Sequence, residues 1–503
     1  MTWAEDLRAG RARQVRPEGQ KGDHMNIDML IGGRSVATDD RVERRDPVTG
    51  DIASRAAVAT PDHVRAAAEA AQAAFAGWSQ TGPSDRRAIL LKAADIMASR
   101  AGEFTRAMLA ETGATPGWAG FNVMLSANIL RETASAVTQV LGHVIPSDKP
   151  GTLAMSVRRP HGVCLAIAPW NAPVILGTRA VAVAIACGNT VILKASELCP
   201  ATHRLIATCL EDAGLPPGVI NVVTNRPEDA AAIVSALIEA PEVRHVNFTG
   251  STRVGRIIAA QAARCLKPSL MELGGKAPLI VLEDAHLDGA VDAAIFGSFM
   301  NQGQICMSTE RIIVHEAIAD AFVARLAERA GALPAGDPRD KVVLGSLVTR
   351  EAAERMDALI ADALDKGARQ VAGGDRDGAI VPATLLDNVT ADMRVYAEES
   401  FGPVKPIIRV RDEDEAVRIA NDTEYGLSSA VFSQDIRRAM RVAERLDTGI
   451  CHINGPTVAD EAQMPFGGMK DSGFGRFGGR EAIDAFTVSR WITIEDPEQH
   501  YPF

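Results

Sequence analysis

Short apolar runs alternate with helical segments over most of this chain, and this alternation constrains the fold more than any other feature. Almost wholly apolar runs lie at residues 162–168, 190–194, 219–223 and 243–248, and helical periodicity fills the gaps at 172–186, 201–213 and 228–237. Strands that are buried on both faces and joined by helices form a parallel sheet. A second series spans residues 277–453, with runs at 278–282, 311–314, 404–410 and 429–432. We therefore predict two doubly wound α/β domains in series.

The segments that flank this region carry simpler signals. Helical periodicity is expected at residues 61–78, in a second segment that follows Ser84, a good N-cap residue, and at about 121–140. Residues 487–494 alternate like an edge strand. These signals add helices before the first sheet and one exposed strand after the second.

Length and charge narrow the classes of protein. The 503 residues exceed one ordinary core, which agrees with two domains. The formal net charge of −11 argues against nucleic acid and anionic membranes as partners. No apolar run approaches the roughly 18 residues that a membrane helix needs. Residues 1–25 are charged and lack the apolar core of a signal peptide, so we interpret them as a loose extension, with Met25 as an alternative start.

The cysteine pattern suggests free thiols. There are seven cysteines, and no two are spaced as CxxC. The odd number and this spacing predict neither a disulfide framework nor a metal site, and a reducing cytoplasm is the expected compartment. At least one thiol is then available for chemistry.

A strand-to-helix turn within residues 243–255 is the best cofactor signal. A strand ends at Phe248, Gly250 and Ser251 form the turn, and a helix begins near Thr252. Amides at a helix start and the helix dipole favour an anion. Gly250 permits close backbone approach, and Gly255 permits the helix to pack on the sheet. The segment suits a dinucleotide pyrophosphate, although an ordinary strand-to-helix turn has the same pattern.

A second glycine segment imitates the dinucleotide fingerprint. Residues 473–478 match G-x-G-x-x-G literally. The fingerprint requires a preceding strand and a βαβ unit, and neither is expected here. We interpret these glycines as part of a flexible or tightly turned segment.

Lys194 and Glu197 follow the apolar stretch at 190–193. Ligands of doubly wound sheets bind beyond the carboxyl ends of the strands. A carboxylate there accepts hydrogen bonds from ribose hydroxyls and repels a 2′-phosphate, so Glu197 favours NAD over NADP. Two solvated loop residues are the alternative interpretation.

Three polar positions beside apolar runs are candidates for catalysis. Cys306 lies in a polar, glycine-containing loop, whereas the other cysteines mostly lie in apolar runs. Glu272 ends an apolar run beside two glycines, and a buried carboxyl has a raised pKa that suits a general base. Asn171 lies between Pro169 and Pro173, where a fixed amide can stabilise an oxyanion. Taken singly, each has an inert structural alternative.

Six spaced segments resemble the aldehyde dehydrogenase superfamily, in that family's order. They are Pro169-Trp-Asn171, Phe248-Thr-Gly-Ser251, Glu272-Leu-Gly-Gly-Lys276, Gly303-Gln-Ile-Cys306, Glu398-Glu-Ser-Phe-Gly-Pro403 and Pro465-Phe-Gly-Gly468. The resemblance runs from about residue 26 to the end. It implies Cys306 as nucleophile, Glu272 as base, and Asn171 with the Cys306 amide as oxyanion donors. It also implies an NAD site that comprises Trp170, Lys194, Glu197, Phe248, Gly250, Ser251, Gly255, Leu273, Glu399 and Phe401.

The resemblance also implies a domain plan and an assembly. A Rossmann-like NAD-binding domain would comprise residues 26–141 and 159–275, and a catalytic domain residues 276–486. A small β-arm of residues 142–158 and 487–503 would join subunits into a homodimer or homotetramer. Many relatives carry Glu after the late Gly-Arg, but here Phe477 follows Arg476, which puts a proton relay there in doubt.

The aldehyde is the least determined feature. Residues 118–123, 175–180 and 304–310 look most like the vanillin, salicylaldehyde and benzaldehyde dehydrogenase branch. The expected aromatic pocket comprises Trp118, Phe121, Met124, Arg179, Ile305 and Met307. Arg179 would contact a ring oxygen, or else form a structural ion pair. The rival functions are an aliphatic semialdehyde dehydrogenase and a catalytically silent binding protein. A CoA-acylating enzyme is disfavoured because Glu272 supplies a hydrolytic base.

Overall fold

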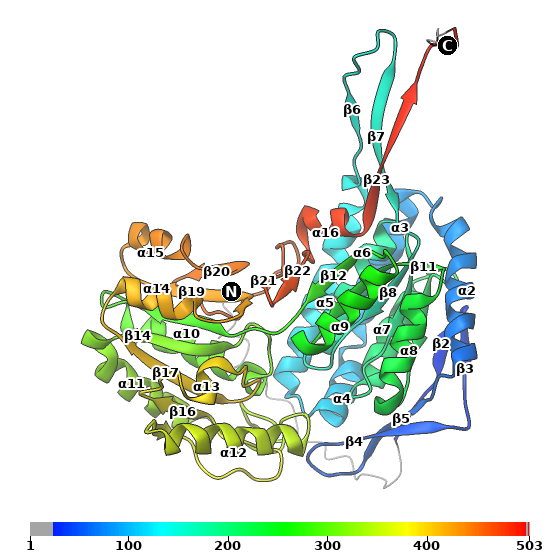
Figure 1. Cartoon of the computed structure of the whole chain (residues 1–503). Coiled ribbons are helices and arrows are strands. Elements are labelled where there is room, and N and C mark those ends of the chain that lie inside the picture. Colours follow the sequence, from blue (N-terminus) through cyan, green and yellow to red (C-terminus); the bar gives the residue numbers. More distant parts are fainter. Residues whose placement is uncertain (1–23, 499–500, 502–503) are drawn as a thin grey trace.

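The computed structural model describes residues 24–498 and Tyr501 of the chain. Figure 1 shows two α/β bodies side by side and a thin β-arm that projects from one of them. This confirms the predicted fold of two sheets and an arm. The predicted extension falls almost wholly outside the described residues, and its last residue, Met25, instead begins a strand. Within the described residues, no helix is both long and apolar enough to cross a membrane.

The first sheet has eight strands in the order β22-β12-β11-β8-β9-β10-β2-β3. Their bounds are Gly473–Phe474, Ser269–Glu272, Val243–Thr249, Val163–Ile167, Thr190–Lys194, Ile220–Val223, Met29–Ile31 and Arg34–Val36. The pairs from β12 to β10 are parallel, so the last residues of β12, β11, β8 and β9 share one edge. Chain order reverses between β8 and β11, and such a switch point is where doubly wound sheets bind ligands.

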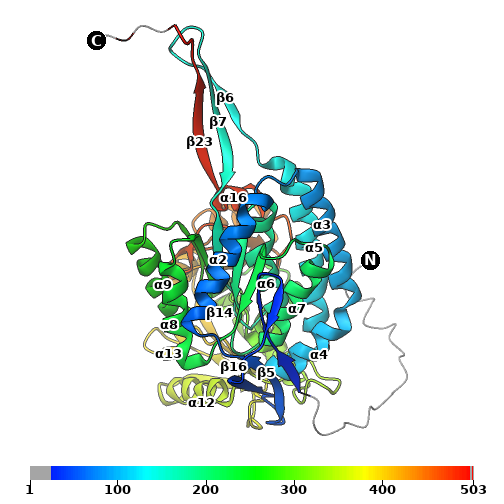
Figure 2. The ribbon, with the colours of Figure 1, turned by 90° about the vertical axis from the view of Figure 1, so that its right-hand side faces the viewer.

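Helices cover both faces of this sheet. They are α2 (Pro61–Trp78), α3 (Pro83–Ser99), α4 (Ala101–Thr112), α5 (Pro116–Ala136), α6 (Pro173–Ala186), α7 (Pro200–Asp212), α8 (Ala230–Glu239) and α9 (Thr252–Arg264), with 3-10 turns at Val137–Gln139 and Pro227–Asp229. Figure 2 shows α2, α8 and α9 on one side of the strands and α3, α5 and α7 on the other. Val163 and Leu165 pack toward the first set, and Cys164 and Ala166 toward the second. Because both faces are covered, the central strands are almost wholly buried, and β8 is apolar at every position.

Helix starts differ from the prediction where proline intervenes. Ser84 is not an N-cap, because Pro83 already occupies the first turn and Gly82 precedes the helix. The third predicted helix begins five residues earlier, at Pro116, where the Thr115 hydroxyl accepts a hydrogen bond from the Trp118 amide at 3.4 Å. Proline with its fixed φ is favoured in a first helical turn. The sequence prediction missed α4 altogether.

The second sheet has seven strands in the order β15-β16-β17-β14-β13-β19-β20. Their bounds are Arg369–Ala372, Thr384–Asp387, Val404–Val410, Thr309–His315, Ala277–Val281, Ser428–Phe432 and Ile450–Ile453. All pairs except β15–β16 are parallel. The accompanying helices are α10 (Leu287–Phe299), α11 (Glu316–Gly331), α12 (Arg350–Asp365), α13 (Arg394–Ala397), α14 (Glu413–Asn421) and α15 (Ile436–Ala443), with a 3-10 turn, η3, at Met300–Gly303. Helices α10 and α11 pack on one face, and α12, α14 and α15 on the other. Helix α16 (Gly479–Ala485) instead packs on the first body beside the arm.

The arm is a three-stranded sheet of β6 (His143–Ile145), β7 (Leu153–Pro160) and β23 (Thr487–Ile494), which projects at the top of Figure 1. Strand β23 pairs antiparallel with the whole of β7, so residues 487–494 form the predicted edge strand. Two smaller sheets pair β1 (Met25–Ile27) and β4 (Arg41–Arg45) with β5 (Ile52–Ala57), and β18 (Tyr425–Gly426) with β21 (Met469–Lys470).

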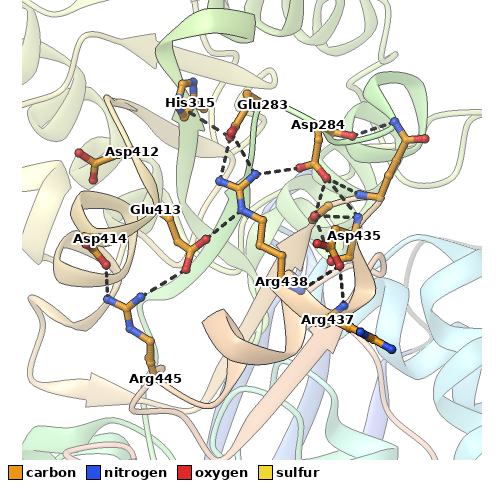
Figure 3. Close-up of polar contacts among 12 residues, drawn as sticks. Glu283, Asp284, His315, Asp412, Glu413, Asp414, Asp435, Arg437, Arg438 and Arg445 are labelled. Atoms are coloured by element: carbon orange, nitrogen blue, oxygen red, sulfur yellow. Dashed lines mark hydrogen bonds and ion pairs between the residues drawn. The ribbon is translucent and has the colours of Figure 1, made fainter.

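A network of ion pairs lies at the carboxyl ends of the strands of the second sheet (Figure 3). Arg438 of α15 donates to both oxygens of Glu283, at 3.0 and 3.1 Å, and to Glu413 at 2.9 Å. Glu283 follows β13, and Glu413 begins α14. The network therefore joins β13, α14 and α15 at the carboxyl ends of the parallel strands. Cys306 lies at the opposite ends of these strands, in the loop before β14.

Candidate active site

A strained turn carries Cys306 into the space between the two sheets. Asn301, Gln302 and Gly303 adopt φ of +49°, +55° and +73° in succession. Two consecutive non-glycine residues in this region are unusual and cost free energy. The Asn301 side chain donates to the Asn171 carbonyl at 3.0 Å, and the Gln302 side chain donates to the Ser346 carbonyl at 3.0 Å. These buried hydrogen bonds hold the turn that precedes the thiol.

The loop after β8 carries Asn171 to the same place. The Asn171 side chain, 6% exposed, donates one hydrogen bond to the Gln304 carbonyl at 3.0 Å. An amide nitrogen carries two hydrogens, so one remains for a ligand. The Trp118 indole donates to the Asn171 carbonyl at 2.9 Å and fixes the loop from the other side. Asn171 and Cys306 line the same two cavities.

Glu272 ends β12 beside Cys306. Burial raises the pKa of Glu272 to about 8, against the lowering effect of a hydrogen bond with the Cys306 thiol. Burial, and then the Glu272 carboxylate, raise the pKa of Cys306 well above its usual value. Among the described residues, Glu272 Oε1 is buried and finds no hydrogen-bond partner. A thiol and a carboxyl in contact, with the carboxyl titrating near neutral pH, form a pair able to exchange a proton.

A cavity of about 210 Å³ opens at the switch point of the first sheet, and we call it the polar cavity because the carboxylates of Glu272 and Glu399 lie in its lining. Its lining comprises Pro169, Trp170, Asn171, Leu176, Thr249, Gly250, Ser251, Glu272, Leu273, Gly274, Cys306, Glu399 and Phe401. The Glu399 carboxylate accepts a hydrogen bond from the Gly275 amide at 2.8 Å, and burial raises its pKa to about 7. The Phe401 ring meets Trp170 edge-on, with centroids 5.7 Å apart. Backbone amides, carboxylates and flat rings suit a nucleotide.

The glycines of this region are required by close packing. A Cβ at Gly250 would lie 2.5 Å from the Phe248 ring, and a Cβ at Gly255 would lie 2.3 Å from the Leu273 side chain. Phe248 therefore packs against Gly250, and Gly255 packs against Leu273, but neither Phe248 nor Gly255 lines the cavity. At Gly478, a Cβ would lie 2.2 Å from a carbonyl oxygen, which agrees with a tight turn in residues 473–478.

Lys194 ends β9 and Glu197 follows it, and both lie outside the lining of this cavity. They form an ion pair with each other, and the Asn225 side chain donates to the same Glu197 oxygen at 2.7 Å. Lys194 is only 5% exposed, so Glu197 has a fixed position rather than that of a solvated loop residue.

An apolar cavity of about 390 Å³ reaches Cys306 from the other side. Its lining comprises Trp118, Phe121, Asn171, Ala172, Ile175, Leu176, Arg179, Phe296, Met300, Ile305, Cys306, Met307, Val458, Ala459, Asp460, Glu461 and Phe466. Trp118 and Phe121 stack with centroids 5.6 Å apart. Five of the six predicted pocket residues are here. Met124 is not, because it faces outward on α5, is 48% exposed and lines a separate hollow.

Arg179 forms the structural ion pair that the sequence offered as one alternative, and it also lines the apolar cavity. It donates to both oxygens of Asp460, at 2.8 and 3.0 Å, so the structural ion pair exists. It also lines the apolar cavity, with its guanidinium 4.6 Å from the Phe466 ring centre. Its Nη1 is buried and finds no hydrogen-bond partner among the described residues. A donor thus remains for an oxygen atom in this cavity.

Phe477 is a core residue. It is 1% exposed, exchanges backbone hydrogen bonds with Phe466 and packs on Phe486. A phenyl ring cannot carry a proton, so no relay passes through this position.

Several lining residues escaped the sequence analysis. Asp460 is 281 positions from its partner Arg179 and belongs to no apolar run, so nothing local marked it. Phe466 belongs to the Pro465-Phe-Gly-Gly468 segment, which could have drawn it into the pocket. Gly274 and Thr249 adjoin predicted residues and line the polar cavity.

Comparison with known proteins gives consistent matches. The profile of the aldehyde dehydrogenase family matches residues 35–492. A vanillin dehydrogenase of Pseudomonas sp. strain HR199 is 58% identical over 480 residues, which cover 95% of this chain and 99% of that protein. A salicylaldehyde dehydrogenase of Pseudomonas sp. strain C18 is 54% identical over 95% of this chain and 100% of that protein. The crystal structure of a salicylaldehyde dehydrogenase from Pseudomonas putida G7, complexed with salicylaldehyde, superposes with a TM-score of 0.94 at 51% identity, covering 95% of this chain and all of that one.

Proposed function

This chain belongs to the aldehyde dehydrogenase family, and we propose that it oxidises an aromatic aldehyde, such as vanillin or a hydroxybenzaldehyde, to the carboxylate with NAD. The observation that carries the proposal is that Cys306 lies where a polar and an apolar cavity meet. One cavity suits a nucleotide end and the other a ring. The linings share only Asn171, Leu176 and Cys306.

The lining of the apolar cavity favours a neutral aromatic aldehyde over an anionic semialdehyde. Trp118, Phe121 and Phe466 offer ring contacts. Arg179 is neutralised by Asp460, and Glu461 adds a further negative charge to the lining. A semialdehyde carboxylate would therefore meet no unpaired cation. The Arg179 Nη1 donor suits a hydroxyl or methoxy oxygen on the ring.

Cys306 and Asn171 would carry the first step. The thiol proton passes to solvent, and the resulting Cys306 thiolate attacks the aldehyde carbon. The free hydrogen of the Asn171 amide and the Cys306 backbone amide stabilise the alkoxide. When bound, NAD supplies the hydride acceptor, and the residues that would hold it are those of the polar cavity together with Lys194 and Glu197. The product on Cys306 is a thioester.

Glu272 would carry the second step. A water molecule that binds the unpartnered Glu272 oxygen loses a proton to this carboxylate. The resulting hydroxide attacks the thioester and releases the acid, and Cys306 recovers its proton. The raised pKa of Glu272 makes it a stronger base than an ordinary glutamate.

Glu197 supports NAD over NADP. Its carboxylate is held by Lys194 and Asn225 at the carboxyl edge of the sheet. A ribose diol can donate to it, whereas a 2′-phosphate would add a second negative charge beside it. Replacing Glu197 with Gln should lower the ratio of kcat/KM with NAD to kcat/KM with NADP. An unchanged ratio would contradict this assignment.

The β-arm supports a homodimer or homotetramer. Val144, Trp491 and Ile494 are 74%, 77% and 58% exposed on it. Apolar side chains on a projecting sheet suggest an interface.

We further propose the cytoplasm as compartment, residues 26–141 and 159–275 as the NAD-binding domain, 276–486 as the catalytic domain, and 142–158 with 487–503 as the arm.

The direct test is NADH formation with an aldehyde panel. Vanillin, benzaldehyde and salicylaldehyde should be turned over faster than succinic semialdehyde. Cys306→Ala should abolish turnover with every aldehyde while NAD binding remains. Preference for succinic semialdehyde would support the aliphatic alternative, and no turnover of any aldehyde would support a binding protein.

A further inference from the structure

A buried three-charge cluster lies behind the polar cavity, and no catalytic step described above uses it. Glu310 lies between Lys276 and Lys405, with carboxylate-to-ammonium distances of 2.9 and 2.7 Å. The three side chains are 0–2% exposed. Burying such charges is costly unless they are paired and hydrogen-bonded. A cluster of this kind therefore calls for a structural reason.

The cluster holds both neighbours of Glu399. The Ser400 amide donates to Glu310 at 2.7 Å, and the Ser400 hydroxyl donates to its other oxygen at 2.6 Å. On the other side, the Lys276 ammonium donates to the Glu398 carbonyl at 2.5 Å. The residues before and after Glu399 are thus fixed by one buried carboxylate and its lysine partner.

The same cluster determines where the Glu399 side chain reaches. Gly275, next to Lys276 in the chain, donates its amide to the Glu399 carboxylate at 2.8 Å. The main-chain position of Glu399 and its hydrogen-bond donor are therefore both anchored through Lys276. Arg355 adds a hydrogen bond to the Glu399 carbonyl at 2.6 Å, but from a partly exposed position.

Phe401 depends on the same turn. It adopts φ of +48°, which is strained for a phenylalanine. The Ser400 hydroxyl oxygen, whose hydrogen is shared with Glu310, lies 3.2 Å from the Gly402 carbonyl on the other side of Phe401. Strain of this kind persists only where the surroundings overdetermine it, and the hydrogen bonds to Glu310 supply that constraint.

The charges keep this arrangement at neutral pH. Burial opposes ionisation, yet Lys276 and Lys405 hold the pKa of Glu310 down to about 2. Burial lowers the pKa of Lys276 to about 8 despite the attraction of Glu310. Glu310 is therefore ionised, and loss of its charge would leave two buried cations facing each other.

We propose that Glu310 is a positioning residue, which sets the turn of residues 398–402 so that Glu399 and Phe401 face the cofactor. The inference rests on the proposed function, because it takes the polar cavity as the nicotinamide end of the dinucleotide site. It adds a residue that touches neither cofactor nor substrate.

The test compares Glu310→Gln with a matched control. Fluorescence titration of NADH, without aldehyde, should show a Kd raised about tenfold or more in Glu310→Gln. Alkylation of Cys306 by iodoacetamide, also without cofactor, should stay within about twofold, because the hydrogen bonds of its loop run to Asn171 and Ser346. The control is Asp387→Asn, which removes an equally buried carboxylate that is bonded to Arg369 and Arg409 at the far end of β16. It should leave both measurements unchanged.

Two further variants keep the test decisive. If Glu310→Gln does not fold, Ser400→Ala removes only the hydroxyl links and should raise the NADH Kd about threefold. Glu310→Gln with Lys405→Met removes one of the uncompensated cations and should recover most of the affinity, a rescue that general loss of packing would not give. Unchanged NADH affinity in Glu310→Gln or in Ser400→Ala, absence of rescue, or equal weakening in Asp387→Asn overturns the proposal. A wild-type protein that binds NADH but oxidises no aldehyde would sink the proposed function alone.

Discussion

The pH dependence of thioester hydrolysis is a sharp test of the site. Burial raises the pKa of Glu272 to about 8. Only its ionised form accepts a proton from water, so about one carboxyl in ten is active near pH 7, and about nine in ten near pH 9. The hydrolytic rate should therefore rise about tenfold between these values. An ordinary glutamate would be fully ionised throughout and would give no such rise.

The variant Glu272→Gln distinguishes this rise of the rate with pH, called here the pH limb, from a rise caused by the titration of Cys306. The variant should show no pH limb, and its steady-state turnover should fall about a hundredfold or more, since it lacks the base. A pre-steady-state burst of NADH should remain, because the thioester still forms. The Glu272 carboxylate raises the pKa of Cys306, so its removal should lower that pKa and speed alkylation at a fixed neutral pH.

The assay is stopped-flow NADH absorbance with vanillin or benzaldehyde, at several pH values and saturating NAD. A wild-type turnover that is flat from about pH 6 to about pH 9 would refute the reasoning. The same limb persisting in Glu272→Gln would assign it to another group.

Three further outcomes follow from contacts described above. Asn171→Ala should lower kcat about a hundredfold with little change in aldehyde KM, since the oxyanion loses a donor; steady-state kinetics check this, and an effect on KM alone would contradict it. Trp118→Ala should raise the KM of benzaldehyde about tenfold and leave the KM of a short aliphatic aldehyde unchanged, while the lost hydrogen bond to Asn171 lowers kcat for both alike; equal effects on the two KM values would argue against a ring contact. Arg438→Met should lower Tm by about 2 °C and leave kcat unchanged, because its carboxylate partners are partly exposed and each pair contributes little; a thermal shift assay measures it, and a fall in kcat would contradict the distance from Cys306.

Elements buried on both faces were predictable, and surface elements were less so. The run that became β8 is apolar throughout, and the run that became β9 is apolar at its three central positions, a pattern typical of strands covered on both faces. Helix α4 has no side-chain N-cap hydrogen bond, and the prediction overlooked both the helical spacing of its buried residues Phe104, Ala107, Met108 and Glu111 and the Gly113 that ends it. At Pro83 and Pro116, helix starts were misplaced because proline within the first turn was overlooked.

Site residues beside strand ends were predictable, and partners across the fold were not. Asn171, Ser251 and Glu272 each follow or end an apolar run, so topology alone brings them to one edge. The pairing of Arg179 with Asp460, and of Glu310 with Lys276 and Lys405, joins residues 34 to 281 positions apart. Nothing in one local segment reveals such a pairing, because it depends on tertiary packing.

The division of the space around Cys306 into two cavities bears on redesign. Fourteen of the seventeen residues that line the apolar cavity are absent from the lining of the polar cavity. Changes among them can therefore admit bulkier or differently decorated rings without disturbing the nucleotide contacts. Substrate range and coenzyme choice can then be engineered as separate modules, each by its own library.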